Sequence, residues 1–399
     1  MLVLELKTYP TPTQQTSIEE AIRTTQFIRN KAIRQWMDAP ALNKKETSKT
    51  LYVLSKTLAH EFSFVKQLNS TARQAATERA WNAILRFYRG QDRKPKFQKD
   101  NRSVEFKQSG WKLSDDYKKI TISSNKIGTL KLKGTRNLEH YAEHKIFRVR
   151  IVRRADGYYV QFCIDANRTM VHQPMGSTIG IDVGLKHFLT DSNGETVENP
   201  RFLRTSEVSV KRLQRRHSKC KKGSKNRRKA QNQLARKHLK ITRQRKDFAV
   251  KTARQIIVNN DFVVIEDLRI RNLVKNRKVS KSFSDAALSL FRNWLEYYGR
   301  ISGVPVIAVA PQYTSQECSK CGQMVQKAMS ERTHICSCGL ILDRDWNAAK
   351  NILAKGLKET SLLSTLGHKG SNASGEETSL LELNVLMKVF SLKEESAGL

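Results

Sequence analysis

Two apolar segments that each run into a carboxylate set the strongest limit on the fold of this chain. Residues 178–184 read TIGIDVG and place Asp182 between two glycines, and residues 262–268 read FVVIEDL and reach Glu266 after an apolar run. Such runs are typical of buried strands. A carboxylate at this position is costly to bury unless a cation, a hydrogen bond or a metal ion compensates it. We therefore expect two buried strands whose ends carry a functional site.

A third carboxylate, Asp345, lies where the chain enters a helix that we expect over 345–357. Any one of the three acids alone would most simply be a helix-capping or ion-paired structural residue. Together, a hairpin that starts with GIDVG, a later VIED strand and an aspartate at a terminal helix indicate a ribonuclease H-like arrangement. There the acids converge on two divalent cations about 4 Å apart, which hold the attacking and leaving oxygens of a phosphodiester. Two Mg²⁺ ions suit this role, with Mn²⁺ as a substitute, because Mg²⁺ takes few carboxylates and completes its shell with water and phosphate.

Two neighbouring aspartates compete for these roles. Asp267 follows Glu266 on the strand and should point to the opposite face, and Asp343 precedes Asp345 by two residues. The sequence Asn-Ala-Ala at 347–349 is typical of the first turn of a tightly packed helix, which favours Asp345. The predicted catalytic and magnesium-binding residues are Asp182, Glu266 and Asp345.

Four of the six cysteines form a C-x₂-C and a C-x-C pair separated by fourteen residues, and a glycine follows each pair. Four thiolates bind zinc tetrahedrally, leave no open position for water, and can fold a segment too small to have its own core. Disulfides are the alternative, and so few cysteines in a chain this long do not indicate an oxidising compartment. We expect one structural Zn²⁺, with His334 as a competing ligand and with Cys163 and Cys220 uninvolved. The predicted zinc ligands are Cys318, Cys321, Cys336 and Cys338.

The chain carries a formal net charge of +36, from 73 lysines and arginines against 37 acids in 399 residues. Residues 201–255 contain ten lysines and eleven arginines against two acids, a net charge of +19 and more than half of the total. Such a charge calls for a polyanion, with nucleic acid as the first interpretation and an anionic membrane surface as the second. The 39% hydrophobic fraction argues against wholesale disorder. The lack of an 18-residue apolar run and of a signal-peptide pattern predicts no membrane partner.

The pattern of residues 205–256 predicts one or two long basic helices, interrupted near the Lys-Lys-Gly-Ser sequence at 221–224. Each cation there could be a solvated surface charge, whereas a row of them could follow a nucleic-acid backbone. Trp81, Trp111 and Tyr313 could stack on bases, although core packing suits Trp81 better. The predicted nucleic-acid-binding residues are Arg212, Arg215, Arg216, Lys221, Lys222, Arg227, Arg228, Arg236, Lys237, Arg243 and Arg245.

The remaining pattern predicts an α+β multidomain protein. Residues 2–6 alternate as a strand, residues 13–88 are helical in pattern, and residues 102–165 alternate repeatedly, as in an antiparallel sheet or small barrel that the first strand could complete. A linker is expected at 172–177. Further on we expect a helix over 284–301, a strand over 304–310, and a mobile acidic tail in which 380–392 could be a short helix.

The motifs at 180–184 (GIDVG), 265–268 (IEDL), 343–352 (DRDWNAAKNI) and in the two cysteine pairs occur in an order that resembles the TnpB family, the transposon-encoded OrfB proteins related to compact type V CRISPR effectors. The resemblance is strong over about 175–355 and weaker over the N-terminal half. It implies a wedge-like β-barrel from 1–10 and 91–172, a helical recognition domain at 11–90, a RuvC-like ribonuclease H-like nuclease domain from 177–311 and 340–357 with basic helices 205–256, a zinc-binding target nucleic-acid-binding insert at 312–339, and a flexible tail at 358–399.

The resemblance also implies an activity. A protein of this family would bind a guide RNA from the transposon end and cut double-stranded target DNA beside a short flanking motif, as a monomer with its RNA in the prokaryotic cytoplasm. The guide–target duplex would be recognised by its A-form backbone, which suits many cations on helices. None of the three acids is substituted, which counts against a nuclease-inactive descendant. The flanking motif would be read near Asn69, Ser70 and Thr71, together with Phe106, Lys107 and Gln108.

Two other functions share these features. A DNA transposase or recombinase with the same three-acid site would act on bare DNA ends, and an RNA-guided DNA-binding repressor would bind without cutting. The acids alone do not separate the transposase from the endonuclease. A discrete RNA that co-purifies with the protein would do so.

Overall fold

A computed structural model of the chain describes residues 1–39, 43–268, 280–328 and 331–367. The chain divides into two compact units, Met1–Arg168 and Thr169–Leu399, and each is described by itself. Residues 380–392, which could form a short helix by their pattern, lie outside the described residues.

The first unit is built around a seven-stranded antiparallel sheet with the order β2-β6-β7-β1-β5-β4-β3. The N-terminal strand β1 lies between β7 and β5, as the sequence predicts. Within the described residues the ladders run from β2 to β3 without a pairing that closes them, so closure into a barrel stays a prediction. The strands are β1 (Leu2–Thr8), β2 (Ser103–Phe106), β3 (Trp111–Leu113), β4 (Lys119–Ile122), β5 (Gly128–Lys133), β6 (Ile146–Arg154) and β7 (Gly157–Ile164), with a 3₁₀ turn at Glu139–Tyr141.

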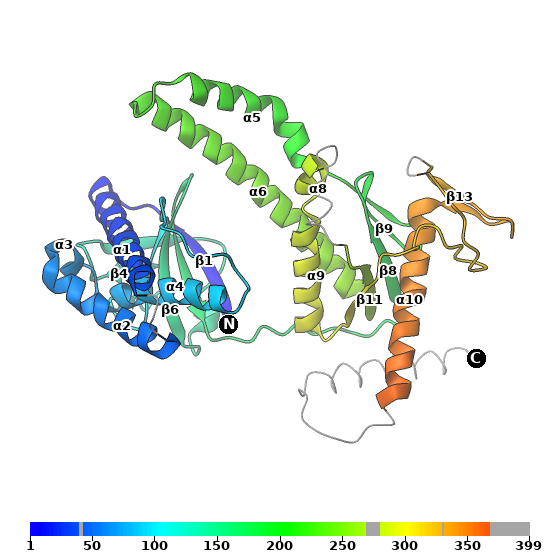
Figure 1. Ribbon diagram of the computed structural model, residues 1–399, viewed down its shortest axis with the longest axis horizontal. Helices are drawn as coiled ribbons and strands as arrows, with labels where there is room; N and C mark the ends of the chain where they lie inside the picture. The colour runs from blue at the N-terminus through cyan, green and yellow to red at the C-terminus, as the bar shows by residue number, and fades with distance from the viewer. Residues whose placement is uncertain (40–42, 269–279, 329–330, 368–399) are drawn as a thin grey trace. The chain divides into compact units, whose positions relative to one another are not determined.

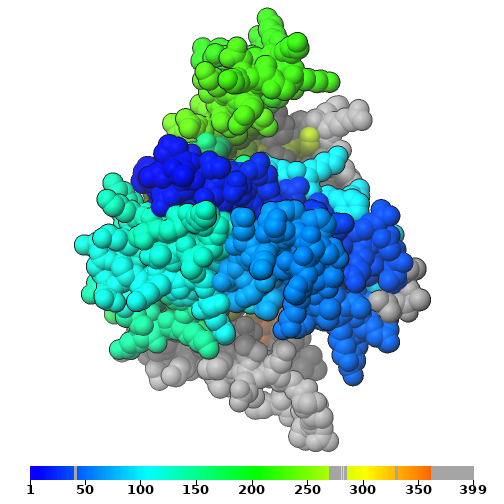
Figure 2. Space-filling view, turned by 90° about the vertical axis from the view of Figure 1, so that its left-hand side faces the viewer, coloured from blue at the N-terminus to red at the C-terminus, as the bar shows by residue number. Residues whose placement is uncertain are grey.

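Four helices are inserted between β1 and β2 (Figure 1). The first helix begins after Thr11, whose side chain forms a capping box with Gln14, and Pro12 occupies its first turn. Its residues Ile18 and Ile22 share one core with inward-facing residues of the sheet. Figure 2 shows the blue helical and cyan strand segments of this unit as one continuous surface. The helices are α1 (Pro12–Asp38), α2 (Lys44–Glu61), α3 (Ser63–Lys66) and α4 (Ser70–Tyr88).

The second unit contains a five-stranded sheet with the order β10-β9-β8-β11-β12. Strand β8 pairs antiparallel with β9 and parallel with β11, and β12 continues the parallel part. The two predicted acid-bearing strands are therefore neighbours. The strands are β8 (Thr178–Val183), β9 (His187–Asp191), β10 (Thr196–Glu198), β11 (Phe262–Glu266) and β12 (Val306–Val309), and β13 (Thr333–Ile335) and β14 (Ile341–Asp343) form a separate hairpin.

Helices cover both faces of this sheet (Figure 1). Helices α6 and α9 share a core with Val263 and Ile265, whereas Ile352 of α10 packs with Phe262 and Val264 on the other face. This alternation follows from the strand period of two. The helices are α5 (Phe202–Lys219), α6 (Lys225–Asn259), α8 (Ser280–Ala286), α9 (Leu288–Ser302) and α10 (Arg344–Gly367).

Three expectations about this unit need correction. The helix expected over 284–301 is two helices, because Ala287 adopts a left-handed backbone with φ 55° and breaks the run. Helix α10 continues to Gly367, so residues 358–367 are not part of a flexible tail, and Thr360 is buried. Strands β10, β13 and β14 were not expected, because each has only three residues. Among the described residues, no helix combines the length and apolar character that crossing a membrane requires.

Candidate active site, zinc site and nucleic-acid surfaces

The three predicted acids come from β8, β11 and the start of α10. Ile181 lies opposite Ile265 in the parallel ladder. Asp182 and Glu266 are the next residues on these two strands, so they lie side by side. Both belong to the sheet face that α10 covers. Contact there is very close: a Cβ atom added at Gly180 would lie 2.3 Å from the carbonyl oxygen of Ala349. Glycine at 180 is what allows the helix that begins at residue 344 to approach this strand.

The like charges of the three acids act on one another, and burial and nearby cations modify this effect. Burial, followed by the negative charges of Glu266 and Asp345, raises the pKa of Asp182 to about 8. Burial also raises the pKa of Glu266, against the hydrogen bond that the Thr314 hydroxyl donates to its Oε1 at 2.8 Å and the charge of Lys355. Carboxylates that share a low-dielectric site in this way are typical of functional and cation-binding sites.

The two competing aspartates have other partners. Asp343 Oδ1 accepts a hydrogen bond from the backbone N–H of Asp345 at 2.8 Å, so the helix-capping function falls on Asp343. Asp345 is left to pair with Arg344, at 3.2 Å. Asp267 pairs with Arg292. The geometry thus supports the choice of Glu266 and Asp345, whose roles stay predictions.

The four predicted zinc ligands form one compact group. Their sulfur atoms all lie within 4.8 Å of one another, with Cys318 and Cys338 3.7 Å apart and Cys321 and Cys336 3.6 Å apart. A tetrahedral zinc with Zn–S bonds of about 2.3 Å requires sulfur–sulfur distances of about 3.8 Å, so the donor set fits this ion. In the described part of the chain no other cluster of three or more cysteine, histidine or acidic ligands is as compact, the three carboxylates included.

Two buried asparagines of α10 hold this insert, and sequence reasoning missed them. Asn347 Nδ2 donates to the carbonyl of Glu317 at 2.8 Å, and its Oδ1 accepts from the N–H of Ser319 at 3.0 Å. One turn later, Asn351 Nδ2 donates to the carbonyls of Glu317 and Thr314 at 2.6 and 2.9 Å. The same helix therefore carries Asp345 and anchors the cysteine insert. Their spacing of four residues was a signal, because it places both amides on one helix face.

His334 lies beside the cysteine group. It is fully buried on β13, its Nδ1 contacts Lys327 Nζ, and its Nε2 has no hydrogen-bond partner among the described residues. Burial raises the pKa of the Cys318 thiol, while the N–H groups of Cys321 and Lys320 lower it, for a net shift well below its ordinary value. Cys163 lies in β7 and Cys220 follows α5, outside the group.

The basic segment forms two helices, α5 and α6, whose break falls at the predicted 221–224. Some of the proposed phosphate contacts already have protein partners. Arg227 donates to the carbonyls of His217 and Cys220, and Arg245 pairs with the buried Asp285 at 2.8 Å. Lys237 is half-buried. The exposed members of the predicted set are Arg212, Arg215, Arg216, Lys221, Lys222, Arg228, Arg236 and Arg243.

The two stretches predicted to read a flanking motif come together at the N-terminus of α4. The Thr71 hydroxyl donates to the carbonyl of Ser109 at 3.0 Å and lies 3.4 Å from the N–H of Lys107. Asn69 caps α4 through the N–H of Thr71, and Ser70 and Gln108 are exposed. The prediction is wrong for Phe106, which is fully buried because it alternates into the core of the sheet.

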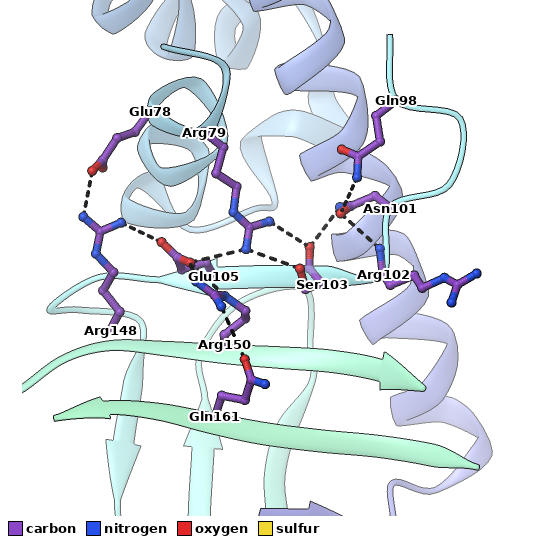
Figure 3. Close-up of polar contacts among 10 residues, drawn as sticks. All are labelled: Glu78, Arg79, Gln98, Asn101, Arg102, Ser103, Glu105, Arg148, Arg150 and Gln161. Carbon is purple, nitrogen blue, oxygen red and sulfur yellow. Dashed lines mark hydrogen bonds and ion pairs between the residues drawn. The ribbon is translucent and has the colours of Figure 1, made fainter. Parts of the chain in front are cut away.

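A charged network fastens α4 to the sheet beside this surface (Figure 3). Glu105 of β2 has 2% of its side chain exposed and accepts from Arg79, Arg148 and Arg150. Glu78 joins Arg148, at 2.7 Å. A second ion pair links Glu78 to Lys107, with 2.7 Å between Glu78 Oε2 and Lys107 Nζ. Lys107 is thus held by an acid of α4.

Three aromatic residues were predicted as possible base-stacking residues. Trp81 packs in a core cluster, the Trp111 ring N–H donates to the carbonyl of Lys107, and Tyr313 is 61% exposed.

Comparisons with known proteins agree with this architecture. A family model described as "Probable transposase" (OrfB_IS605) matches residues 161–277, and one described as "Cas12f1-like, TNB domain" matches residues 289–352. A Streptomyces pristinaespiralis protein named "Putative RNA-guided DNA endonuclease" is 31% identical over 360 residues, 88% of each chain. "Putative RNA-guided DNA endonuclease InsQ" of Escherichia coli K12 is 25% identical over 316 residues, 75% of this chain and 77% of that one.

Solved structures share the fold. A chain of the "Cryo-EM structure of the Cas12f1-sgRNA-target DNA complex" superposes with a TM-score of 0.56 at 15% identity, over 85% of this chain and 82% of that one. The chain therefore has the mixed α/β architecture of that structure. The identity with the Streptomyces protein over most of both chains establishes the family. The chain belongs to the TnpB family of transposon-encoded OrfB proteins.

Proposed function

We propose that the chain is a transposon-encoded, RNA-guided DNA endonuclease that binds a transposon-derived guide RNA and hydrolyses target DNA next to a short flanking motif. The observation that carries the proposal is that Asp182, Glu266 and Asp345 lie together, where burial and then the charges of the other two acids raise the pKa of Asp182. Family membership supports the rest, because relatives of this extent of identity bear the name RNA-guided DNA endonuclease.

The active site is proposed to use two Mg²⁺ ions. When bound, these ions would activate a water and stabilise the charge that develops on the phosphodiester oxygens. The protein's own part is to hold the ligands. Thr314 orients Glu266, Arg344 pairs with Asp345, and Asp343 caps α10 so that its start is fixed. Because the pKa of Asp182 is raised, a cation that binds there would compete with a proton.

We propose that the other parts of the chain each recognise a different part of the nucleic acid. Residues 1–10 and 91–172 would form the wedge-like barrel, 11–90 the recognition helices, 177–311 and 340–357 the RuvC-like nuclease domain, and 312–339 the zinc-bound insert that contacts target nucleic acid. The exposed cations of α5 and α6 would follow the backbone of the guide–target duplex, because an A-form backbone is read by charge and shape. The protein would act as a monomer with its RNA.

The experiment that tests this proposal is reconstitution. The full chain is expressed with the flanking DNA of its source transposon, the co-purifying RNA is sequenced, and cleavage of a plasmid that matches the RNA is measured with and without Mg²⁺. We expect cleavage that depends on RNA, match and metal. Cutting of transposon ends without RNA would instead identify a transposase, and matched binding without cutting would identify a repressor. Asp343→Asn, which retains a capping side chain, is the control for Asp345→Asn.

A further inference from the structure

A cationic cavity of about 290 Å³ opens in the second unit between the turn after β8, the start of α5 and α8. Four cations line it: Lys186, Arg201, Arg204 and Arg332. One acid, Asp285, also lines it, so the side chains around the cavity carry a formal charge of +3. None of these residues belongs to the predicted catalytic, zinc or nucleic-acid-binding sets. A pocket with this excess of cations is a site for an anion.

Asp285 does not neutralise the four cations of the cavity, because its carboxylate is already engaged by other groups of the protein. Asp285 is buried and accepts hydrogen bonds from the backbone N–H groups of Leu203 and Arg204 at 2.8 and 3.1 Å. It also pairs with Arg245 at 2.8 Å. The carboxylate therefore caps α5 and fixes Arg245, which stabilises the wall.

Two of the cations are positioned by the backbone at the start of α5. Arg201 adopts a left-handed conformation, with φ 45°, that non-glycine residues rarely adopt. Its N–H donates to the side chain of Asn199 at 3.2 Å, and its guanidinium donates to the carbonyl of Lys186 at 3.4 Å. Arg204 donates to the Ser282 hydroxyl, also at 3.4 Å. These long bonds use few of the five donors of each guanidinium, which leaves planar donors for an anion.

The other two cations connect the cavity to the candidate active site. Lys186 Nζ lies 3.7 Å from Asp343 Oδ2, and Arg332 Nη1 lies 3.8 Å from Asp345 Oδ2. Both distances exceed that of a hydrogen bond, so these are loose ion pairs. An anion in the cavity would therefore lie next to the three acids. A nucleic-acid strand, which carries a phosphate at every nucleotide, could place one phosphate in the cavity and the next at the acids.

We propose that this cavity binds a phosphodiester of the DNA strand being cut, adjacent to the phosphodiester at Asp182, Glu266 and Asp345. The assignment rests on the proposed endonuclease function and names a subsite of that same site. Arginine suits it because its planar donors match phosphate oxygens in pairs. The contact carries no sequence information, as a guided nuclease requires, and it orients the strand so that the next phosphate meets the acids.

The first test replaces one phosphate charge at a time. Targets that carry a single uncharged methylphosphonate at each position around the cut are cleaved by the guide-loaded full chain under single-turnover conditions. We expect one flanking position to lower the wild-type rate by about 10- to 100-fold, the cost of misplacing a reacting group. Arg204→Ala should lower the rate on the unmodified target by a similar factor, and the methylphosphonate should then have no further effect. Target affinity should change less than about twofold, because base pairing with the guide supplies it.

The matched control is Lys251→Ala, which removes an exposed cation of α6 outside the cavity. This variant should retain the full methylphosphonate effect at the same position. Effects of Arg204→Ala and the methylphosphonate that multiply, rather than overlap, would overturn the proposal.

A second test does not depend on cutting. In an Asp182→Ala background, Ser282→Cys places a thiol in the cavity wall, and target strands carry a disulfide-forming tether on single phosphates. We expect cross-linking at the phosphate that the methylphosphonate scan identifies, and none in the parent that lacks Ser282→Cys. Absence of this cross-link would refute the subsite even if the wild type cuts. A wild type that never cuts matched DNA, yet cross-links at one phosphate, would refute the endonuclease function and retain the subsite.

Discussion

Two buried glutamates, one in each unit, have opposite surroundings. Glu105 in the first unit is buried, which would raise its pKa, but Arg79, Arg150 and Arg148 reverse the effect and lower it. Glu266 in the second unit is buried with one hydroxyl donor, and its pKa is raised. The first glutamate is fully satisfied by its own protein and has a structural role. The second lies among further acids, and this is the arrangement that a protein needs to bind a cation from outside.

The largest expected effect concerns the acids of the second unit. Asp182→Ala, Glu266→Ala and Asp345→Ala should each lower single-turnover cleavage by more than about 10³-fold, since loss of even one transition-state hydrogen-bond donor costs about 10²- to 10³-fold. Matched target binding should be nearly unchanged. If Asp343→Ala abolishes cutting while Asp345→Ala does not, the third acid is misassigned.

The counterpart in the first unit should affect stability. Glu105→Gln leaves three arginines around a buried position without their countercharge, and we expect it to lower the free energy of unfolding by about 3 kcal/mol. The measurement is denaturant unfolding of the full chain, with hydrogen exchange of residues 103–106 and 146–154 to localise the effect. Glu61→Gln, on the exposed end of α2, is the control and should change little. Equal loss in both variants would show that the network is not stabilising.

The pH dependence sharpens the same contrast. Because the pKa of Glu105 is lower in the folded chain than in the unfolded one, its contribution is complete above about pH 4.3 and is lost as the pH falls through the folded value. The stability difference between wild type and Glu105→Gln should therefore shrink on acidification below about pH 4. A difference that is constant down to pH 2 would contradict the ionic explanation.

Measuring zinc binding distinguishes the predicted cysteine ligands from the neighbouring His334. Cys318→Ser should lower the zinc content of the purified chain from near one per molecule, and zinc-free wild type would refute the site. His334→Gln should keep the zinc and the all-sulfur absorption spectrum of a cobalt-substituted protein, because four thiolates complete the tetrahedron. A nitrogen-containing spectrum in the wild type that His334→Gln abolishes would make His334 a ligand.

The smallest expected effect is that of truncation. Removal of residues 368–399 should change matched cleavage by less than about twofold, whereas removal from residue 358 onward deletes the last turns of α10, including buried Thr360, and should destabilise the chain. Thermal unfolding and cleavage of the two truncated proteins test this. Equal activity of both would show that the end of α10 is dispensable.

The sequence predicted what depends on local pattern. Asp182 and Glu266 could be found because carboxylates interrupt apolar strands, and the break between the basic helices follows from a glycine in a polar run. What failed depends on tertiary contact. Phe106 was assigned to a surface because four residues of alternation do not reveal which face is buried. The arginine partners of Glu105 lie 26 or more residues away in sequence, and Asp285 caps a helix 82 residues before it, so no local signal marks either.

The two asparagines of α10 have a consequence for building chimeric proteins. Asn347 and Asn351 both hold the carbonyl of Glu317, so the cysteine insert and the helix that carries Asp345 depend on the same bonds. An insert exchanged alone between relatives would have to reproduce the backbone that these amides recognise. Residues 312–357 are therefore the natural segment for transplantation, since it includes both sides of every one of these hydrogen bonds.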